Sequence, residues 1–220
     1  MTTGTDAGQE PVVYQGQFGT FTIEASDRQE VILYRAGLAV AAVCFGLGTV
    51  LVLSFGADER ILPSLSFLYT GFWLGLGMSL WKIHIYLKPL HRLLQLFWLV
   101  GGVASFFVAH KFAEPFVLTV YQQSSYLWGV GFTFAALTGI FFKEAFCFNR
   151  FETKLLTPVV PLLLLGHLFN FLPELAKTIL LALWAVNFLV FALRKVIQPI
   201  PPDIGDKSVF EYLARSQQPA

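Results

Sequence analysis

The stretch AGLAVAAVCFGLGTVLVLSF, residues 36–55, decides the fold class of this chain. It contains 20 consecutive residues without a charged side chain. An α-helix of roughly 20 apolar residues is long enough to cross the hydrocarbon core of a bilayer, which is about 30 Å thick. The sequence therefore predicts a transmembrane helix at this point, and five further segments have a similar character.

The composition of the whole chain agrees with a lipid environment. Of its 220 residues, 55% are hydrophobic and only 13% are charged, whereas a soluble domain carries about 25% charged residues. The net charge of +1 and the absence of a continuous basic stripe argue against nucleic-acid binding. The two cysteines, Cys44 and Cys147, form neither a disulfide framework nor a metal-ligand spacing, so we expect no metal and no other cofactor.

Six apolar segments come close to the length of a membrane span. We expect an all-α, polytopic bundle within residues 27–195, with spans at about 36–55, 61–81, 93–108, 125–142, 155–171 and 178–193. The segment at 155–171 fits least well, because Pro158 and Pro161 interrupt its start. A kinked helix and a re-entrant segment both remain open there.

The distribution of basic residues predicts the orientation of the bundle. With six spans, twelve of the fifteen Lys and Arg residues fall on the side of the two termini, and cytoplasmic loops carry the excess of basic residues. We therefore expect both termini on the cytoplasmic (or stromal) side. Residues 1–26 are expected to form a polar surface segment with a short hairpin or an extended stretch at 12–24, and residues 196–220 a flexible tail.

One candidate polar site lies in the predicted fifth span. His167, Asn170 and Glu174 follow one another at helical spacing and would share one helix face beneath the two prolines. Polar groups in a span are candidate sites because their burial in hydrocarbon is costly. Such residues more often hydrogen-bond to neighbouring helices and fix their packing. The nearest acids, including Glu144, are expected at span ends where water reaches them.

A second candidate site is a predicted cytoplasmic loop from Lys143 to Lys154. Its charges alternate in sign around aromatic residues, which makes the segment amphipathic. Such a segment could dock a partner or, as is more common, lie on the membrane surface. The residues assigned to this surface are Lys143, Glu144, Phe146, Phe148 and Arg150.

The sequence lacks the patterns of an enzyme, and we expect no enzymatic activity. It contains no H-E-x-x-H metal motif, no phosphate-binding loop and no G-x-S-G of the intramembrane serine proteases. Pigment or haem binding through His84, His91 or His167 is the cofactor alternative. His84 and His91 flank a basic loop, which favours a role at the membrane surface.

The stretch LTGIFFKEAFCFNRFETKLLTPVVPLLLLGHLF, residues 137–169, and YQGQFG, residues 14–19, carry a resemblance. Together they resemble a family of uncharacterised integral membrane proteins of cyanobacteria and plastids. The most specific part is KEAFCF followed by the paired prolines and Gly-His. The resemblance implies a bacterial plasma membrane or a thylakoid membrane, and suggests a role in assembling or stabilising a pigment-protein complex.

The leading hypothesis is a non-enzymatic protein that acts through contacts with lipids and with a larger membrane complex, as an assembly or stabilising factor. The alternative is a small-solute transporter or channel with its polar site near the kinked fifth span. The small residues Gly71 and Gly75 permit close helix contact, either within the monomer or between subunits. The oligomeric state is left open.

Overall fold

The computed structural model describes residues 13–15, 19–83, 85, 87–200 and 204. The chain forms two compact units. Residues 33–198 make up the helical bundle, and residues 1–32 with 199–220 make up the other unit. The predicted C-terminal tail, residues 196–220, lies mostly outside the described residues.

Of the two alternatives expected at 12–24, a hairpin and an extended stretch, the smaller unit contains a hairpin. Strand β1 (Val13–Gln15) pairs antiparallel with β2 (Thr20–Thr22), so that Tyr14 lies opposite Phe21. The two rings stack with their centroids 5.7 Å apart. Cross-strand aromatic pairs of this kind stabilise a hairpin that would otherwise be marginal in water.

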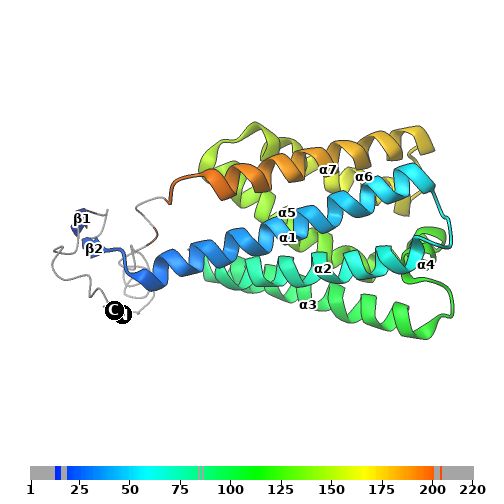
Figure 1. Ribbon diagram of the computed structural model, residues 1–220, viewed down its shortest axis with the longest axis horizontal. Coiled ribbons are helices and arrows are strands. Elements are labelled where there is room, and N and C mark those ends of the chain that lie inside the picture. The colour runs from blue at the N-terminus through cyan, green and yellow to red at the C-terminus, as the bar shows by residue number, and fades with distance from the viewer. Residues whose placement is uncertain (1–12, 16–18, 84, 86, 201–203, 205–220) are drawn as a thin grey trace, which may run out of the picture. The chain divides into compact units, whose positions relative to one another are not determined.

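Six long helices run antiparallel through the described part of the bundle (Figure 1). They are α1 (Ala25–Phe55), α2 (Leu62–Lys82), α3 (Lys88–Lys111), α5 (Leu127–Phe148), α6 (Phe151–Leu168) and α7 (Glu174–Ile197). A short helix, α4 (Phe116–Gln122), and a 3-10 turn, η1 (Ser124–Tyr126), connect α3 to α5. Each predicted span coincides with one long helix.

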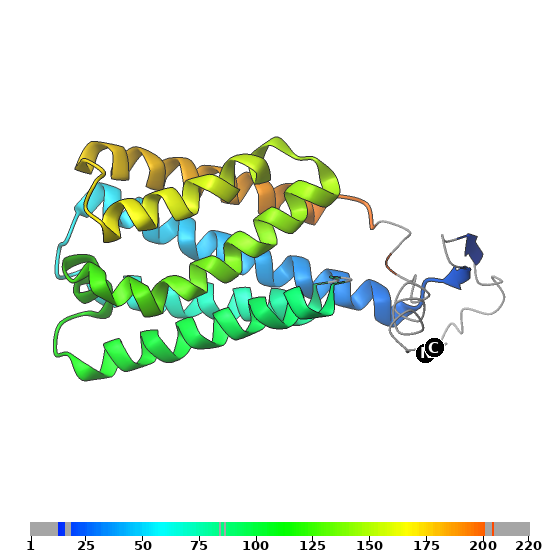
Figure 2. The same cartoon turned by 180° about the vertical axis from the view of Figure 1, so that it is seen from behind.

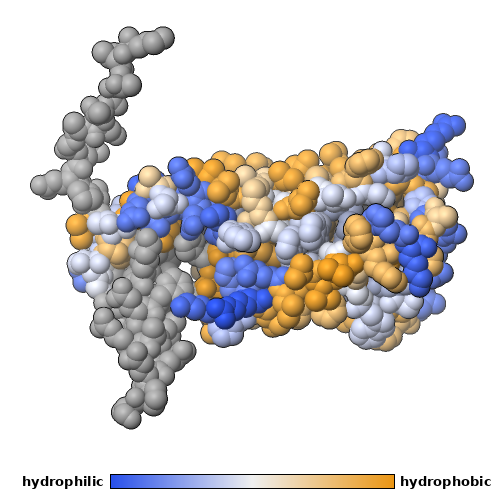
Figure 3. All heavy atoms as spheres, turned by 90° about the horizontal axis from the view of Figure 1, so that it is seen from below, coloured by the Kyte–Doolittle hydropathy of each residue, from blue (hydrophilic) through white to orange (hydrophobic). Residues whose placement is uncertain are grey.

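Five helices of the described chain are long and apolar enough to cross a membrane, namely α1, α3, α5 together with η1, α6 and α7. Seen from the side of α3, hydrophobic residues gather over the middle of the bundle and hydrophilic ones toward its ends (Figure 3). Helix α2 is not among the five, because Ser, Thr, Tyr, Trp and Gly residues lower its mean hydropathy. These helices make a multi-pass membrane protein, and the sixth span stays a prediction.

Helix α6 determines the route of the fifth predicted span. It continues as one helix of 18 residues through Pro158 and Pro161, which corresponds to a length of about 27 Å. Each proline removes one backbone hydrogen bond, and the Thr157 hydroxyl donates to the Thr153 carbonyl at 2.8 Å beside them. Of the two alternatives, the structure therefore has a helix and no re-entrant loop at this position.

The core of the bundle is aromatic. Helix α5 lies between α3 and α6, and α6 packs against α7 (Figure 2). Phe141 of α5 meets Phe188 of α7 edge to face, with centroids 5.3 Å apart and an interplanar angle of 77°. Both side chains are fully buried. Aromatic pairs in this arrangement add to the packing of helices that have no water to exclude.

Helices α1 and α2 come into backbone contact where two glycines face each other. A Cβ atom on Gly75 would lie 2.7 Å from the carbonyl oxygen of Gly37, and one on Gly37 would lie 2.6 Å from that of Gly75. At the same crossing the Ser79 hydroxyl donates a 2.9 Å hydrogen bond to the Tyr34 carbonyl. Gly75, one of the predicted small residues, thus serves a contact within the monomer.

Replacement of Gly75 by Leu should destabilise the bundle, because the new side chain would push α1 away from α2. We expect a loss of about 1–3 kcal/mol or more in the free energy of unfolding, measured by thermal unfolding in detergent micelles. Gly131→Leu is the matched control, since a Cβ atom at Gly131 meets nothing within 4 Å. Equal unfolding temperatures for the two variants would contradict the close contact.

Candidate functional site

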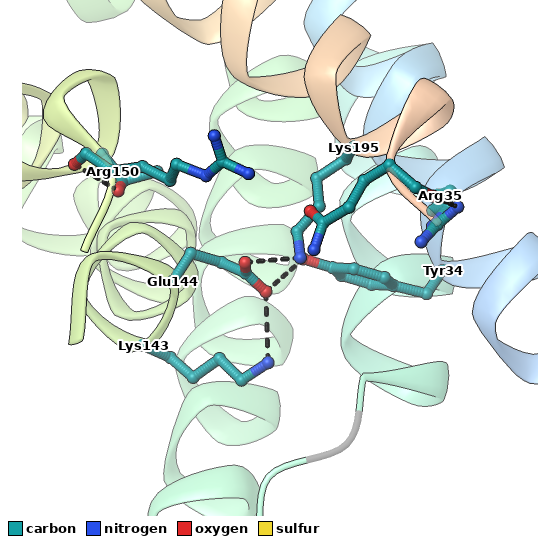
Figure 4. A network of polar contacts seen from close by, with 8 residues as sticks. Tyr34, Arg35, Lys143, Glu144, Arg150 and Lys195 are labelled. Atoms are coloured by element: carbon teal, nitrogen blue, oxygen red, sulfur yellow. Dashed lines mark hydrogen bonds and ion pairs between the residues drawn. The ribbon is translucent and has the colours of Figure 1, made fainter. Parts of the chain in front are cut away.

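A buried carboxylate lies at the end of the bundle where α5 and α7 terminate. The side chain of Glu144 is 1% exposed. Its oxygens accept from the Lys195 ammonium at 2.6 Å, the Lys143 ammonium at 3.1 Å and the Tyr34 hydroxyl at 3.0 Å (Figure 4). Three donors from three helices therefore converge on one carboxylate, and we call this group the Glu144 network.

Lys195 is held in the network by an aromatic ring as well as by the acid. Its side chain is 8% exposed, and its ammonium nitrogen lies 3.9 Å from the centroid of the Phe148 ring. A desolvated ammonium is attracted to the face of an aromatic ring. Phe148 and Glu144 together replace the water that this lysine loses on burial.

A second ion pair, between a buried acid and a half-exposed arginine, lies beside the first. The guanidinium Nη1 of Arg194 donates to both oxygens of Glu152, at 2.9 and 3.0 Å, and the Glu152 carboxylate is buried. Adjacent residues of a helix point about 100° apart. Arg194 can therefore reach α6 while Lys195 reaches α5, and α7 is fixed to both helices.

Arg35 joins the beginning of the bundle to its end. Its Nη1 donates to the Gln198 carbonyl at 2.6 Å, just beyond the end of α7. The first and last turns of the bundle, residues 33–198, therefore lie at the same end. Basic residues of α1, α5 and α7 are gathered there, as the positive-inside argument assumed.

The structure corrects the prediction of a loop from Lys143 to Lys154. Helix α5 continues to Phe148, and only Asn149 and Arg150 separate it from α6. Asn149 has φ 52°, a left-handed conformation that asparagine tolerates better than most residues. The prediction that water reaches Glu144 is also wrong, because the continued helix turns this side chain into the bundle.

The five residues predicted for this surface divide into two groups. Lys143, Glu144 and Phe148 point inward and take part in the Glu144 network. Phe146 and Arg150 are exposed. The inward group holds helices together, whereas the outward group is available for a partner or for lipid.

The other predicted polar site lies at the opposite end of the bundle, and its three residues do not share a helix face. Helix α6 ends at Leu168, Asn170 is exposed in the turn with φ 53°, and Glu174 begins α7. The chain reverses direction between these residues, so their helical spacing has no meaning there. The predicted shared face is therefore wrong.

Tyr121 of α4 connects two of these residues. The His167 Nε2 lies 3.0 Å from the Tyr121 carbonyl oxygen, and the two rings stack at 5.0 Å. The Tyr121 hydroxyl donates to the Glu174 carboxylate at 3.0 Å. Burial and this hydrogen bond raise the pKa of Tyr121, so its phenol stays a neutral donor.

The hydrogen bond to a carbonyl also sets the tautomer of His167. Nε2 must donate, which leaves Nδ1 as an acceptor in the neutral imidazole. This atom is buried and has no partner among the described residues. At this end of the bundle the charged pair, Glu174 with Lys177, is largely exposed on the acid side, in contrast to the buried Glu144 carboxylate.

His84 and His91 were the other two candidates for pigment or haem binding. His84 lies outside the described residues, and the His91 Nε2 is 2.6 Å from the Leu80 carbonyl oxygen, which connects α3 to α2. Within the described ranges, no group of three or more His, Cys, Asp or Glu residues could hold a metal ion. His91 thus has a packing role on α3.

Residues 78–212 match the family described as Uncharacterized integral membrane protein (DUF2301). The chain belongs to this family. No curated protein and no solved structure matches it. The DUF2301 region contains both buried acids and their partners on α7, whereas Tyr34 and Arg35 of α1 lie outside it. An origin of DUF2301 proteins in cyanobacteria and plastids stays a prediction.

The sequence reasoning missed Lys195, Tyr34 and Arg194 as members of the buried networks. A signal existed in the charge pattern. Lys143-Glu144 and Arg194-Lys195 both follow long apolar runs, and the predicted topology places both pairs at the same membrane surface. An ion pair between Glu144 and a basic residue at the end of the last span could therefore have been predicted from the sequence. Nothing in the sequence indicates that Tyr34 would join them.

Glu144→Gln should strongly destabilise the protein, because it leaves the Lys195 ammonium buried without its counter-charge. We expect a loss of about 3 kcal/mol in the free energy of unfolding, measured by thermal or denaturant unfolding in micelles. The double variant Glu144→Leu with Lys195→Met should recover most of this loss. Glu174→Gln is the control, since this carboxylate is 72% exposed. A Glu144→Gln variant as stable as the control would contradict the network.

Proposed function

We propose that this protein is a non-enzymatic membrane protein that binds another membrane protein and thereby assembles or stabilises a complex. The contact surface is the α5–α6 tip, which comprises Phe146, Asn149, Arg150, Phe151 and Lys154. The observation that carries the proposal is the exposure of its aromatic rings, 84% for Phe146 and 75% for Phe151. Arg150 and Lys154 are exposed beside them.

The rigidity of the tip supports this role. Lys195 holds the end of α5 through Glu144, and Arg194 holds the start of α6 through Glu152. A surface that keeps its shape before binding loses less conformational entropy when a partner docks. Aromatic and Arg side chains also supply most of the binding energy in protein interfaces.

The chemistry of the Glu144 network supports a non-enzymatic role. Its buried carboxylate already accepts from two ammonium groups and one hydroxyl. A general base needs a carboxylate that can approach a substrate proton. The network instead holds three helices in one arrangement.

We infer six spans, with α2 as the sixth. It has 21 residues and no charged side chain before Lys82 in its last turn, which gives a length of about 31 Å. The end of the bundle that holds Glu144 then faces the cytoplasm or stroma, since it carries most of the basic residues. The resemblance to cyanobacterial and plastid proteins favours a plasma or thylakoid membrane, whose lipids are the other partners.

A small-solute transporter is the second candidate. The observation in its favour is the buried Nδ1 of His167, which has no partner among the described residues. Many transporters bind solutes at interrupted helices, whereas α6 continues as one helix through Pro158 and Pro161. The α5–α6 tip therefore receives more support than a transport path at His167.

Loss of both tip aromatics should release the partner. Protein purified from its native membrane in mild detergent should co-elute with subunits of one complex. Phe146→Ala with Phe151→Ala should lower their recovery more than tenfold in quantitative mass spectrometry, since each interface anchor contributes more than about 1 kcal/mol. The matched control is Phe67→Ala with Phe106→Ala, at rings 79% and 66% exposed elsewhere on the bundle. Unchanged recovery, or equal loss in the control, would contradict the proposal.

Cysteine labelling tests the orientation. Cys147 is exposed at the α5–α6 tip, and in a Cys44→Ala background a membrane-impermeant maleimide should label it only after cells are permeabilised. In a variant without native cysteines, Asp58→Cys in the α1–α2 turn should be labelled in intact cells. The reverse pattern would place the tip outside. Labelling of both sites from one side would exclude the three spans α2, α3 and α5 between them, and with them α2 as the sixth span.

A further inference from the structure

A groove of about 790 Å³ opens between α2 and α3, at the end of these helices that holds Lys82. Gly77 and the ring of Trp98 line it together with apolar side chains of both helices. On α2 and α3 these are Leu74, Met78, Leu80, Trp81, Leu96 and Leu99, and Leu33 of α1 also contributes. We call it the α2–α3 groove, and it faces away from the core of the bundle.

A pair of tryptophans bounds the open space between the two helices. The Trp73 and Trp98 rings stack with centroids 4.3 Å apart and an interplanar angle of 10°. The indole N–H of each donates to the backbone carbonyl of the other, at 3.2 and 2.9 Å. The two stacked indoles fill the space between α2 and α3 at this level, each ring against a glycine of the other helix. From there toward Lys82 the space is open as the groove.

The length of the groove matches one leaflet of a bilayer. Its lining on α2 runs from Leu74 to Lys82, which is about 12 Å along the helix. Half of the hydrocarbon core is about 15 Å thick. A partner helix, about 10 Å wide, would follow α2 and α3 across both leaflets, whereas this groove ends at Leu74 on α2 and at Leu99 on α3.

The end of the groove nearest the membrane surface, where Lys82 lies, is basic. Lys82 lines it, and the Gln95 amide lies opposite on α3. Arg92 precedes Leu96 by four residues, which places it on the same face of α3 one turn nearer the membrane surface. Arg92 is exposed. The apolar groove therefore leads to positive charge at the depth where lipid headgroups lie.

We propose that the α2–α3 groove binds one anionic phospholipid. An acyl chain lies against the apolar walls and Trp98, and the phosphate lies beside Lys82 and Arg92. The apolar walls provide no hydrogen bonds for a peptide, and the positive end complements a negative headgroup. The bound chain fills the space that is open between the helices from the tryptophan pair toward Lys82.

Native mass spectrometry of the delipidated full-length protein tests the proposal. With phosphatidylglycerol added, one lipid should bind per chain, and phosphatidylcholine should bind at least fivefold more weakly. Arg92→Gln should weaken phosphatidylglycerol binding about fivefold, the effect of about 1 kcal/mol for one basic residue near a lipid surface. Leu96→Trp, which fills the groove, should abolish binding of both lipids.

Two matched variants control for general effects. Arg60→Gln removes an exposed arginine in the α1–α2 turn, away from the groove, and Val103→Trp adds an indole on α3 at a site 62% exposed. Both should bind phosphatidylglycerol as the unaltered protein does. Equal binding of the two lipids, or undiminished binding by Leu96→Trp, would overturn the proposal. So would a loss of dimers in Leu96→Trp, since a second copy would then cover the groove.

Discussion

Helices in a bilayer gain little from the hydrophobic effect when they associate, because lipid tails are as apolar as the side chains. The bundle therefore depends on close packing and on polar contacts between helices. Gly37 and Gly75 bring the backbones of α1 and α2 together in the way this constraint requires. At the same crossing, the Ser79 hydroxyl reaches a backbone carbonyl of α1. Neither contact would form if larger side chains separated the helices.

The buried charges at one end of the bundle serve a different purpose. A buried ion pair adds little net stability compared with apolar residues of the same shape, although removal of one partner costs several kcal/mol. What the pairs supply is specificity. Lys195 must face α5 while Arg194 faces α6, so a rotation of α7 about its axis would break both pairs. Glu152 would lose Arg194, and Glu144 would keep only Lys143 as its cation. The two pairs thereby fix the rotation of α7 about its own axis.

The long helices were predictable because hydropathy and length are local properties of the sequence. The stretch at 36–55 and its five counterparts all coincide with helices, since every backbone group in lipid must be satisfied within its own helix. Helix ends were harder. Asn149 and Asn170 let the chain reverse within a few residues. Because the turn at Asn149 is so short, α5 continues to Phe148, although the charges of Lys143 and Glu144 had suggested a loop there. Long-range partners such as Tyr34 and Glu144, 110 residues apart, leave no trace in local patterns.

The placement of the buried charges also bears on the choice between a binding protein and a transporter. Opening the bundle at the Glu144 end would separate α7 from α5 and α6. The carboxylates of Glu144 and Glu152 would then lose their partners on α7. A solute could drive such a change only by as much as it prefers the open state, and that preference would have to exceed the loss of both pairs. A partner that docks on Phe146 and Phe151 needs no movement of the helices at all. The same contacts that make opening of the bundle costly also keep the α5–α6 tip in a fixed shape. This favours a protein that acts by binding a partner over one that opens to transport a solute.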